Sequence, residues 1–247
     1  PVPLRLVPRE ITPELVWRPE WPRVQTAELI ATGVFAAGIV PFLALPPAEK
    51  KWTSTNTFDE AARNALRLGG EPARNAARDM SDLLLSINAT FPFFIDALGS
   101  AYWSRKSRDV AFQMMEIDAE VLIITGFLQS AVSTLSNRQR PYGRLCPADA
   151  DAQSRDCFSN TRYHSFFSGH SATAFAGAGL ICSHHMKLSL WGGGAPDVLA
   201  CVGGFASAAA TAYLRVASDQ HYLSDILVGS AIGTMTGLGL PWLLHYR

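Results

Sequence analysis

Long uncharged stretches, set apart by short charged segments, are the feature that most restricts the fold of this chain. Ala27–Leu45, Val121–Leu135, Val198–Leu214 and Ile226–Leu240 together contain a single ionisable side chain, Glu28. A surface helix of a water-soluble bundle should carry charge opposite its apolar stripe, and Val198–Leu214 carries none. The pattern therefore predicts helices that cross a membrane, rather than the Ala-rich helices of a soluble bundle.

Along the whole chain we expect six spanning helices in one all-helical bundle, with residues 1–247 as a single domain. A spanning helix needs about 20 apolar residues, and the small residues that dominate the last three spans let helices approach closely. Ionisable residues inside such spans are usually functional or paired, and here they are Asp96, Glu116, Asp118 and Glu120. The expected spans are Leu29–Leu45, Leu83–Trp103, Val110–Leu135, Ser171–Cys182 with an extension to Leu188, Val198–Leu214 and Tyr222–Leu244.

Basic connectors give the expected orientation. The N-terminal arm, residues 1–26, is rich in Arg and Pro, and the connector 104–108 carries three basic side chains. Since Lys and Arg mark the cytoplasmic side, the loops 46–80 and 136–170 are expected on the opposite side. Segment 46–80 is expected to be either a plain connector or an amphipathic helix that lies on the outer surface or covers the active site.

The four cysteines divide into two pairs by position. Cys146 and Cys157 lie in the outer loop 136–170, at a spacing that closes a small ring. We expect them to form a disulfide, because an oxidising compartment preserves such bonds; four free cysteines is the alternative. Cys182 and Cys201 fall inside apolar stretches and are expected to be buried thiols.

Three polar clusters fall at the ends of spans on the same predicted side of the membrane. An alternating up-and-down bundle brings these places together, although they are far apart in the sequence. The clusters are Arg138-Gln139-Arg140-Pro141, Ser168-Gly169-His170, and the set of Arg215, His221 and Asp225.

The residue types in these clusters suit a tetrahedral oxyanion such as phosphate. The guanidinium groups of Arg140 and Arg215 can bind phosphate oxygens in paired, charge-assisted hydrogen bonds. Ser168 and Gly169 precede an apparent helix start, where free backbone N–H groups and the helix dipole favour an anion. Together these residues predict a phosphate site at the edge of the membrane.

Two histidines can divide the chemistry of phosphate ester cleavage. Of His170 and His221, one imidazole can attack phosphorus to form a phosphohistidine, while the other imidazole protonates the departing alkoxide. Asp225 follows His221 by four residues, so it can lie on the same helical face and hold that imidazole in the attacking tautomer. The spacing predicts a His–Asp pair, but it does not say which histidine attacks.

Arg140-Pro141, Ser168-Gly169-His170 and Arg215-x5-His221-x3-Asp225 resemble the three signature motifs of the type 2 phosphatidic acid phosphatase superfamily. That superfamily includes bacterial acid phosphatases, lipid phosphate phosphatases and vanadium haloperoxidases. The motifs span residues 140–225, and the layout of spans extends the similarity across most of the chain. The resemblance implies His221 as the nucleophile, Asp225 as the residue that orients it and His170 as the general acid. The phosphate-binding residues that it implies are Arg140, Ser168, Gly169 and Arg215.

The resemblance thus implies a phosphatase that hydrolyses a phosphate monoester or pyrophosphate of a lipid through a phosphohistidine on His221. Such a route needs no metal or other cofactor, and the sequence contains no Gly-rich nucleotide loop or Cys/His metal cluster of the usual spacing. The 21 basic and 21 acidic side chains cancel, which gives no global field for binding nucleic acid. We expect an integral protein of a bacterial inner membrane with its active site facing the periplasm. The lipid and the oligomeric state are left open.

Three positions depart from the pattern of the superfamily. The first motif usually has a Lys seven residues before its Arg, where this chain has Ser133; Phe167 and Leu214 stand where Pro and Ser are usual. A hydrogen bond to a charged group is worth roughly 1.5–3 kcal/mol, so the missing Lys implies a slower enzyme, a different leaving group, a substitute cation or a lost activity. The candidate substitutes lie in the same outer loop, where ordinary loop charges are the favoured interpretation; they are Arg138, Arg144 and Arg162.

Two further function classes stay open. A vanadate-dependent haloperoxidase would bind vanadate in the same cradle, but the apolar spans argue against it. A catalytically weakened or inert member that binds a phosphorylated lipid is supported by Ser133 alone.

The other histidines receive structural assignments. His164 is expected to be an exposed loop residue, with a position at the site entrance as the alternative. His184 and His185 fall on the predicted cytoplasmic side, where we expect them to meet lipid headgroups.

Overall fold

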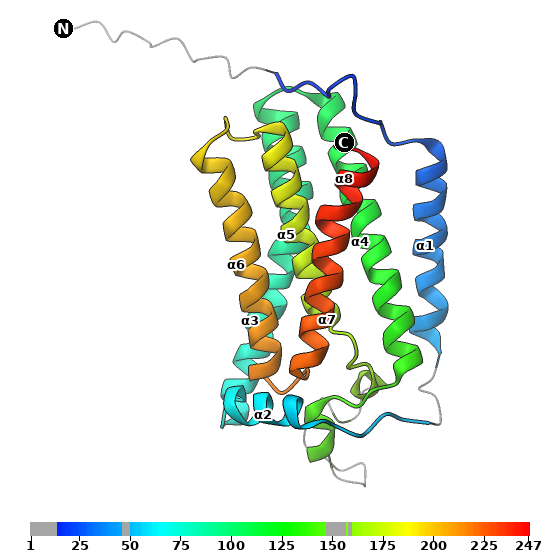
Figure 1. The fold of residues 1–247 in the computed structure, drawn as a ribbon, viewed down its shortest axis with the longest axis vertical. Helices are drawn as coiled ribbons and strands as arrows, with labels where there is room; N and C mark the ends of the chain where they lie inside the picture. Colours follow the sequence, from blue (N-terminus) through cyan, green and yellow to red (C-terminus); the bar gives the residue numbers. More distant parts are fainter. Residues whose placement is uncertain (1–13, 46–49, 147–156, 158–159) are drawn as a thin grey trace, which may run out of the picture.

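Helices make up nearly all of the regular structure (Figure 1). The computed structural model describes residues 14–45, 50–146, 157 and 160–247, so half of the N-terminal arm and parts of both predicted outer loops lie outside the described residues. Within the described ranges there is no β-strand. The helical segments are α1 (Thr26–Ala44), α2 (Thr57–Leu66), α3 (Glu71–Phe91), η1 (Pro92–Ser104), α4 (Arg108–Ser136), η2 (Pro141–Leu145), η3 (Asn160–Tyr163), α5 (Gly169–Leu188), α6 (Ala195–Ala217), α7 (Leu223–Thr234), η4 (Met235–Gly239) and α8 (Leu240–Leu244).

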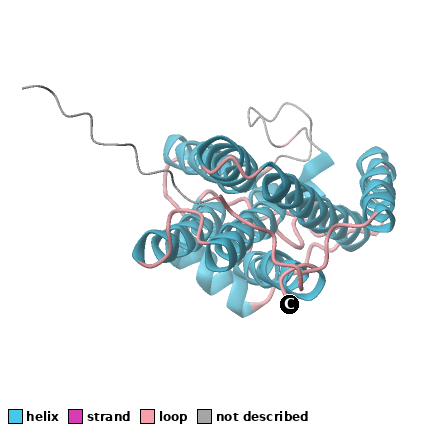
Figure 2. Ribbon diagram, turned by 90° about the horizontal axis from the view of Figure 1, so that it is seen from above, coloured by secondary structure: helices cyan, strands magenta, loops and turns pink. Residues whose placement is uncertain are grey.

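Six long helical rods stand side by side (Figures 1 and 2). They are α1, α3 continued by η1, α4, α5, α6, and α7 continued by η4 and α8. In the described part of the chain, five of these rods are long and apolar enough to cross a membrane, all except α5. The all-helical transmembrane bundle predicted from the sequence is confirmed. The polar last turn of α5 lowers its hydropathy, and α5 packs against α3, α4, α6 and α7 in the middle of the bundle.

Small residues allow the close packing around α5. A Cβ atom on Gly177 would lie 2.1 Å from the carbonyl oxygen of Asn88 in α3, and a Cβ on Gly233 of α7 would lie 2.1 Å from that of Ala172. Only glycine fits at such distances, so these positions let the helices touch through their backbones. The start of α5 is tied to α7 as well, because the N–H of Ser168 donates to the carbonyl oxygen of Asp225 at 3.1 Å.

The two ends of the bundle carry different residues. The motif end, at the bottom of Figure 1, contains residues 138–145, 160–170 and 215–225 together with α2. The terminal end, at the top, contains residues 105–107, 189–194 and 245–247.

The predicted outer segment 46–80 divides between two helices. α2 lies across the motif end (Figure 1). One polar face of α2 points toward the bundle, and Asp59 on this face is completely buried. Its N-cap, Asn56, accepts a hydrogen bond from the N–H of Asp59 at 2.8 Å. Within this segment, residues 57–66 form an amphipathic helix. The second predicted span began too late, because the helix already starts at Glu71 with amphipathic turns that pack against α6.

Two of the acidic residues inside the apolar stretches are paired with histidines at the terminal end. The Nε2 atom of His184 lies 2.9 Å from Oδ1 of Asp118. The Nε2 atom of His245 lies 3.1 Å from Oε2 of Glu120. All four side chains are buried, so each acidic group is paired with an imidazole inside the bundle.

His185 joins three rods at the same end. Its Nε2 atom lies 3.1 Å from Oδ1 of Asp96 in η1, and its Nδ1 atom lies 2.5 Å from Oδ1 of Asp197 in α6. The expectation that His184 and His185 meet lipid headgroups is wrong, since they are 0% and 1% exposed. Both point into the bundle because their carboxylate partners lie on neighbouring rods.

The cysteines form two disulfides. The predicted bond between Cys146 and Cys157 is present. Cys182 and Cys201 also form a disulfide, so the expectation of buried thiols is wrong. The physical reason is the close contact of α5 with α6, which brings the two Cα atoms to 4.2 Å.

Candidate active site

The turn between α6 and α7 carries His221, which is 2% exposed. Its Nδ1 atom lies 2.9 Å from the carbonyl oxygen of Ser165, and its buried Nε2 atom has no hydrogen-bond partner in the described part of the chain. A carbonyl only accepts, so Nδ1 carries the proton and Nε2 carries the lone pair. Burial, followed by the charges of Arg140 and Arg215, lowers the pKa of His221 well below its ordinary value. His221 is therefore a neutral imidazole with a free nitrogen.

The α2 helix holds this turn in place. Asp219 adopts a positive φ of 64° and is 1% exposed. Arg63 and Arg67 of α2 both bind its carboxylate, with nitrogen–oxygen distances of 2.6 and 2.8 Å. The polar face of α2 thus fixes the backbone that precedes His221.

The carboxylate of Asp225, in the first turn of α7, accepts hydrogen bonds from several donors. Its Oδ2 atom accepts from the hydroxyl of Ser165 at 2.6 Å and from the N–H of Tyr222 at 2.9 Å. Its Oδ1 atom accepts from Arg138 at 2.5 Å. Oδ2 lies 3.6 Å from Nδ1 of His221, which is too far for a hydrogen bond. Asp225 therefore acts on His221 through Ser165, whose hydroxyl it holds and whose carbonyl orients the imidazole.

Two arginines from different motifs meet at one glutamine. Oε1 of Gln220 accepts from Nη1 of Arg140 at 2.8 Å and from Nη2 of Arg215 at 3.3 Å. Arg215 also donates to Oδ1 of Asp82 at 3.0 Å and to the hydroxyl of Ser81 at 3.1 Å. The amide of Gln220 thus sets the spacing of two guanidinium groups, the arrangement that recognises an oxyanion.

The start of α5 supplies the second motif. Ser168 is its N-cap, and the hydroxyl of Ser168 accepts from the N–H of Ser171 at 3.3 Å. Gly169 and His170 form the first turn, where backbone N–H groups are free of the helix ladder. Nε2 of His170 lies 2.8 Å from Oδ1 of Asp82, so one carboxylate contacts both His170 and Arg215.

Three of these groups were missed by the sequence analysis: Asp82, Gln220 and the Ser165 backbone. Gln220 directly precedes His221 and could have been suspected from that position. Asp82 lies 88 residues before His170 and carries no local signal.

A cavity of about 320 Å³ opens beside the motifs. Its polar wall includes Arg140, His164 and His170, and its apolar wall comes from α1 and α3. Ser133 lines it as well, at the position where the superfamily usually has Lys. His164 belongs to this wall, so the favoured expectation of an exposed loop histidine is wrong and the alternative holds.

The three candidate substitutes for the missing Lys lie elsewhere, and none of them lines this cavity. Arg138 is 1% exposed and is bound between Asp59 and Asp225, at 2.6 and 2.5 Å. Arg144 pairs with a glutamate of α2 at 2.5 Å. The guanidinium carbon of Arg162 lies 5.4 Å from the ring centre of the adjacent Tyr163. Substitution by one of these arginines stays a prediction without support from their positions.

This chain is similar to one known protein in part of its sequence and to another in its fold. A segment of 96 residues is 35% identical to the lipid A 1-phosphatase of Porphyromonas gingivalis; it covers 39% of this chain and 17% of that protein. The crystal structure of a transmembrane PAP2 type phosphatidylglycerolphosphate phosphatase from Bacillus subtilis superposes with a TM-score of 0.56 at 17% identity. That match covers 88% of this chain and 94% of the other, and it shows the fold.

The family match covers the three motifs themselves. The sequence model of the PAP2 superfamily matches residues 119–247, just over half of the chain, and this region contains all three clusters of the motif end. The chain therefore belongs to the PAP2 superfamily and has the helical bundle of an integral membrane protein.

Proposed function

We propose that this protein is a lipid phosphatase that forms a phosphohistidine on His221 and needs no metal ion. The observation that carries the proposal is the buried Nε2 of His221, which has no hydrogen-bond partner among the described residues and whose imidazole is kept neutral by burial and by Arg140 and Arg215. A neutral nitrogen with a free lone pair beside two guanidinium groups suits attack on a phosphoryl group.

The first half-reaction transfers the phosphoryl group to the protein. Phosphate oxygens bind the guanidinium groups of Arg140 and Arg215 and the free N–H groups at the start of α5. Nε2 of His221 forms a bond to phosphorus while the bond from phosphorus to the lipid oxygen breaks. His170 gives its proton to the departing oxygen, and Asp82 holds the imidazole of His170 in position.

The second half-reaction releases phosphate. His170, now neutral, takes a proton from a water molecule as the water oxygen attacks phosphorus. The bond between phosphorus and Nε2 of His221 breaks, and the lone pair returns to Nε2. Inorganic phosphate leaves with both histidines in their starting protonation states.

The walls of the cavity support a lipid substrate. Phe42 and Leu43 of α1 and Leu85 of α3 form its apolar side, opposite Arg140 and His170. A phosphate can lie on the polar side while its acyl chains leave between the rods, which face the bilayer. The two relatives, named as a lipid A 1-phosphatase and a phosphatidylglycerolphosphate phosphatase, support this class of substrate.

We place the motif end outside the cytoplasm, at the periplasmic face of a bacterial inner membrane. The disulfide of Cys146 and Cys157 at this end supports the assignment, because such bonds persist in oxidising compartments. The basic connector 104–108 at the terminal end supports a cytoplasmic position for that end.

The test is phosphate release by the purified protein in detergent, with and without chelator. The panel consists of phosphatidic acid, phosphatidylglycerol phosphate, undecaprenyl pyrophosphate and lipid A. We expect release from at least one lipid by the parent protein, none by His221→Ala, and no effect of the chelator. Absence of release from every lipid would refute the phosphatase, and loss of activity with chelator would refute the metal-free mechanism.

A further inference from the structure

His164 lines the cavity of the motif end, and its Nε2 atom has no hydrogen-bond partner among the described residues. It follows η3 directly, and its ring lines the same cavity as Ser133, Arg140 and His170. Its Nε2 atom is buried and forms no hydrogen bond with any described residue. Buried polar atoms are nearly always bonded, so an imidazole that keeps an unbonded nitrogen in a residue lining a cavity is available to a ligand once the ring turns toward it.

The backbone holds His164 firmly beside the catalytic machinery. Its N–H donates to the carbonyl oxygen of Thr161 at 3.0 Å, which closes the turn of η3. The next residue, Ser165, donates its N–H to the carbonyl oxygen of Arg138 at 3.0 Å, and its own carbonyl orients His221. His164 is therefore fixed relative to the proposed nucleophile.

The charge of the cavity wall makes a ligand oxygen the fitting partner. Arg140 is the single Lys or Arg among the described residues that line this cavity, and Ser133 directs its hydroxyl to the carbonyl of Ser130 at 3.3 Å. Burial, followed by the charge of Arg140, lowers the pKa of His164. The imidazole is thus neutral, and a neutral imidazole always carries one N–H that can donate to a phosphoryl oxygen.

We propose that His164 is a substrate-binding residue, which donates a hydrogen bond to an oxygen of the phosphorylated headgroup. This hydrogen bond would take the place of the contact that the usual Lys makes in the superfamily, because Ser133, at the Lys position, carries no charge. The inference rests on the proposed function, because it assigns a residue to the phosphate site of that reaction.

The kinetic test uses the lipid that the parent protein hydrolyses fastest. We expect His164→Ala to raise KM about tenfold while kcat changes less than about twofold, because a ground-state contact is lost. His164→Gln retains an N–H donor and should give a smaller rise in KM. The double variant Ser133→Lys/His164→Ala should recover most of the lost affinity, since residue 133 faces the same cavity.

Three outcomes would overturn the inference. One is an unchanged KM in His164→Ala. A second is a failure of Ser133→Lys to improve the His164→Ala protein. The third is a rise in KM for Arg162→Ala instead of His164→Ala, which would identify Arg162 as the missing contact. Thermal unfolding of each variant in detergent checks that the protein is folded.

A binding measurement separates this inference from the proposed function. Inorganic phosphate is titrated calorimetrically into His221→Ala and into His221→Ala/His164→Ala, neither of which needs to turn over. We expect about tenfold weaker binding in the double variant. If no lipid is hydrolysed by the parent protein, the proposed function fails and this titration decides the role of His164 by itself. Equal phosphate binding by the two proteins refutes that role.

Discussion

The two ends of the bundle each hold three of the six histidines, but they use them differently. At the terminal end, His184, His185 and His245 each contact at least one carboxylate, at distances of 2.5 to 3.1 Å. At the motif end, among the described residues, His170 alone lies within hydrogen-bond distance of a carboxylate, and the Nε2 atoms of His164 and His221 have no hydrogen-bond partner.

The arginines differ in the same way. At the terminal end, Arg105 donates to the backbone carbonyls of Ser189 and Leu190, at 3.1 and 3.2 Å. At the motif end, Arg140 and Arg215 converge on one amide oxygen of Gln220. Balanced pairs at one end join neighbouring rods. Convergent cations beside unbonded imidazole nitrogens at the other end are what the proposed function requires for an anion.

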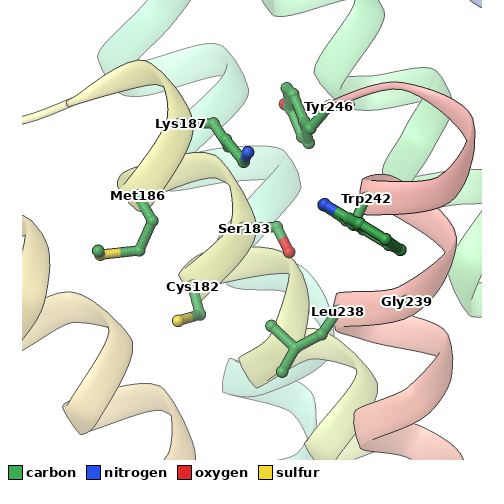
Figure 3. Close-up of a pocket in the computed structure, with 8 residues that line it drawn as sticks. All are labelled: Cys182, Ser183, Met186, Lys187, Leu238, Gly239, Trp242 and Tyr246. Carbon is green, nitrogen blue, oxygen red and sulfur yellow. The ribbon is translucent and has the colours of Figure 1, made fainter.

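Cavity size does not distinguish the two ends. A pocket of about 380 Å³ lies at the terminal end between α5 and the η4–α8 segment, and its lining is largely apolar (Figure 3). Lys187 and Tyr246 are its ionisable residues apart from the disulfide-bonded Cys182. The smaller cavity at the motif end is lined by Arg140, His164 and His170 in addition to its apolar residues.

Among the variants that test the difference between the two ends, the largest change in activity is expected for a substitution of His221. We expect His221→Ala to lower phosphate release at least about 10³-fold, because the proposed reaction loses its nucleophile. The loss of stability should be smaller than that of a buried ion pair, because the variant loses the hydrogen bond from Nδ1 to the carbonyl of Ser165 but leaves no carboxylate without its hydrogen-bond donors. Initial rates and thermal unfolding in detergent measure the two effects. A large loss of stability in this variant would make the two ends alike.

The matched change at the terminal end is His185→Ala. It leaves the carboxylates of Asp96 and Asp197 buried without their imidazole, so we expect a loss of about 3–5 kcal/mol in unfolding free energy. Denaturant titration in mixed micelles measures it. Under folding conditions kcat/KM should be unchanged, and a selective loss of activity would show that the terminal end contributes to the reaction.

One kind of contact occurs at both ends, the hydrogen-bonded pair of a histidine and a carboxylate. At the motif end this pair is His170 and Asp82. Asp82→Asn should lower kcat about tenfold, because the proposed proton donor keeps its ring but loses the carboxylate that positions it. Steady-state kinetics with Asp82→Glu as the conservative control measure the effect. An unchanged kcat together with a lower KM would instead indicate that Asp82 competes with the phosphate.

The acid side of the pH profile provides a smaller effect. The pKa of His221 is lowered, so its imidazole stays neutral at pH values where an ordinary histidine is already charged. We expect kcat/KM to hold through the ordinary histidine pKa of about 6.5 and to fall at lower pH, as His221 becomes protonated. A profile of kcat/KM against pH tests this. An acid limb centred near the ordinary pKa would contradict it.

The smallest effect is expected in the apolar pocket of the terminal end. Gly239 lines this pocket, and nothing lies within 4 Å of a Cβ atom built on it, so the first atom of the side chain in Gly239→Leu meets no clash. We expect phosphate release to change less than about twofold, as for most substitutions outside a site. A strong loss of activity in the folded variant would give this pocket a role in the reaction.

The success of the sequence predictions depended on how far apart the partners lie. Spans and motifs are local patterns, and the disulfide of Cys146 and Cys157 closes a separation of 11 residues. The pairing of Asp82 with His170 and the contact of His185 with Asp96 join residues 88 and 89 positions apart. The roles of His170, His221 and Asp225 came from the resemblance to the superfamily and stay predictions.

By itself, the sequence determined the apolar helices, the three motifs and the end of the bundle where the motifs meet. These features depend on the hydropathy and spacing of residues that are close together in the chain. The tertiary structure decided which polar groups are satisfied. The same residue types form imidazole–carboxylate pairs at the terminal end, whereas at the motif end the Nε2 atoms of His164 and His221 have no hydrogen-bond partner among the described residues. The physical reason is that a buried charge or imidazole is defined by its neighbours, and those neighbours come from other rods whose contacts only packing brings about.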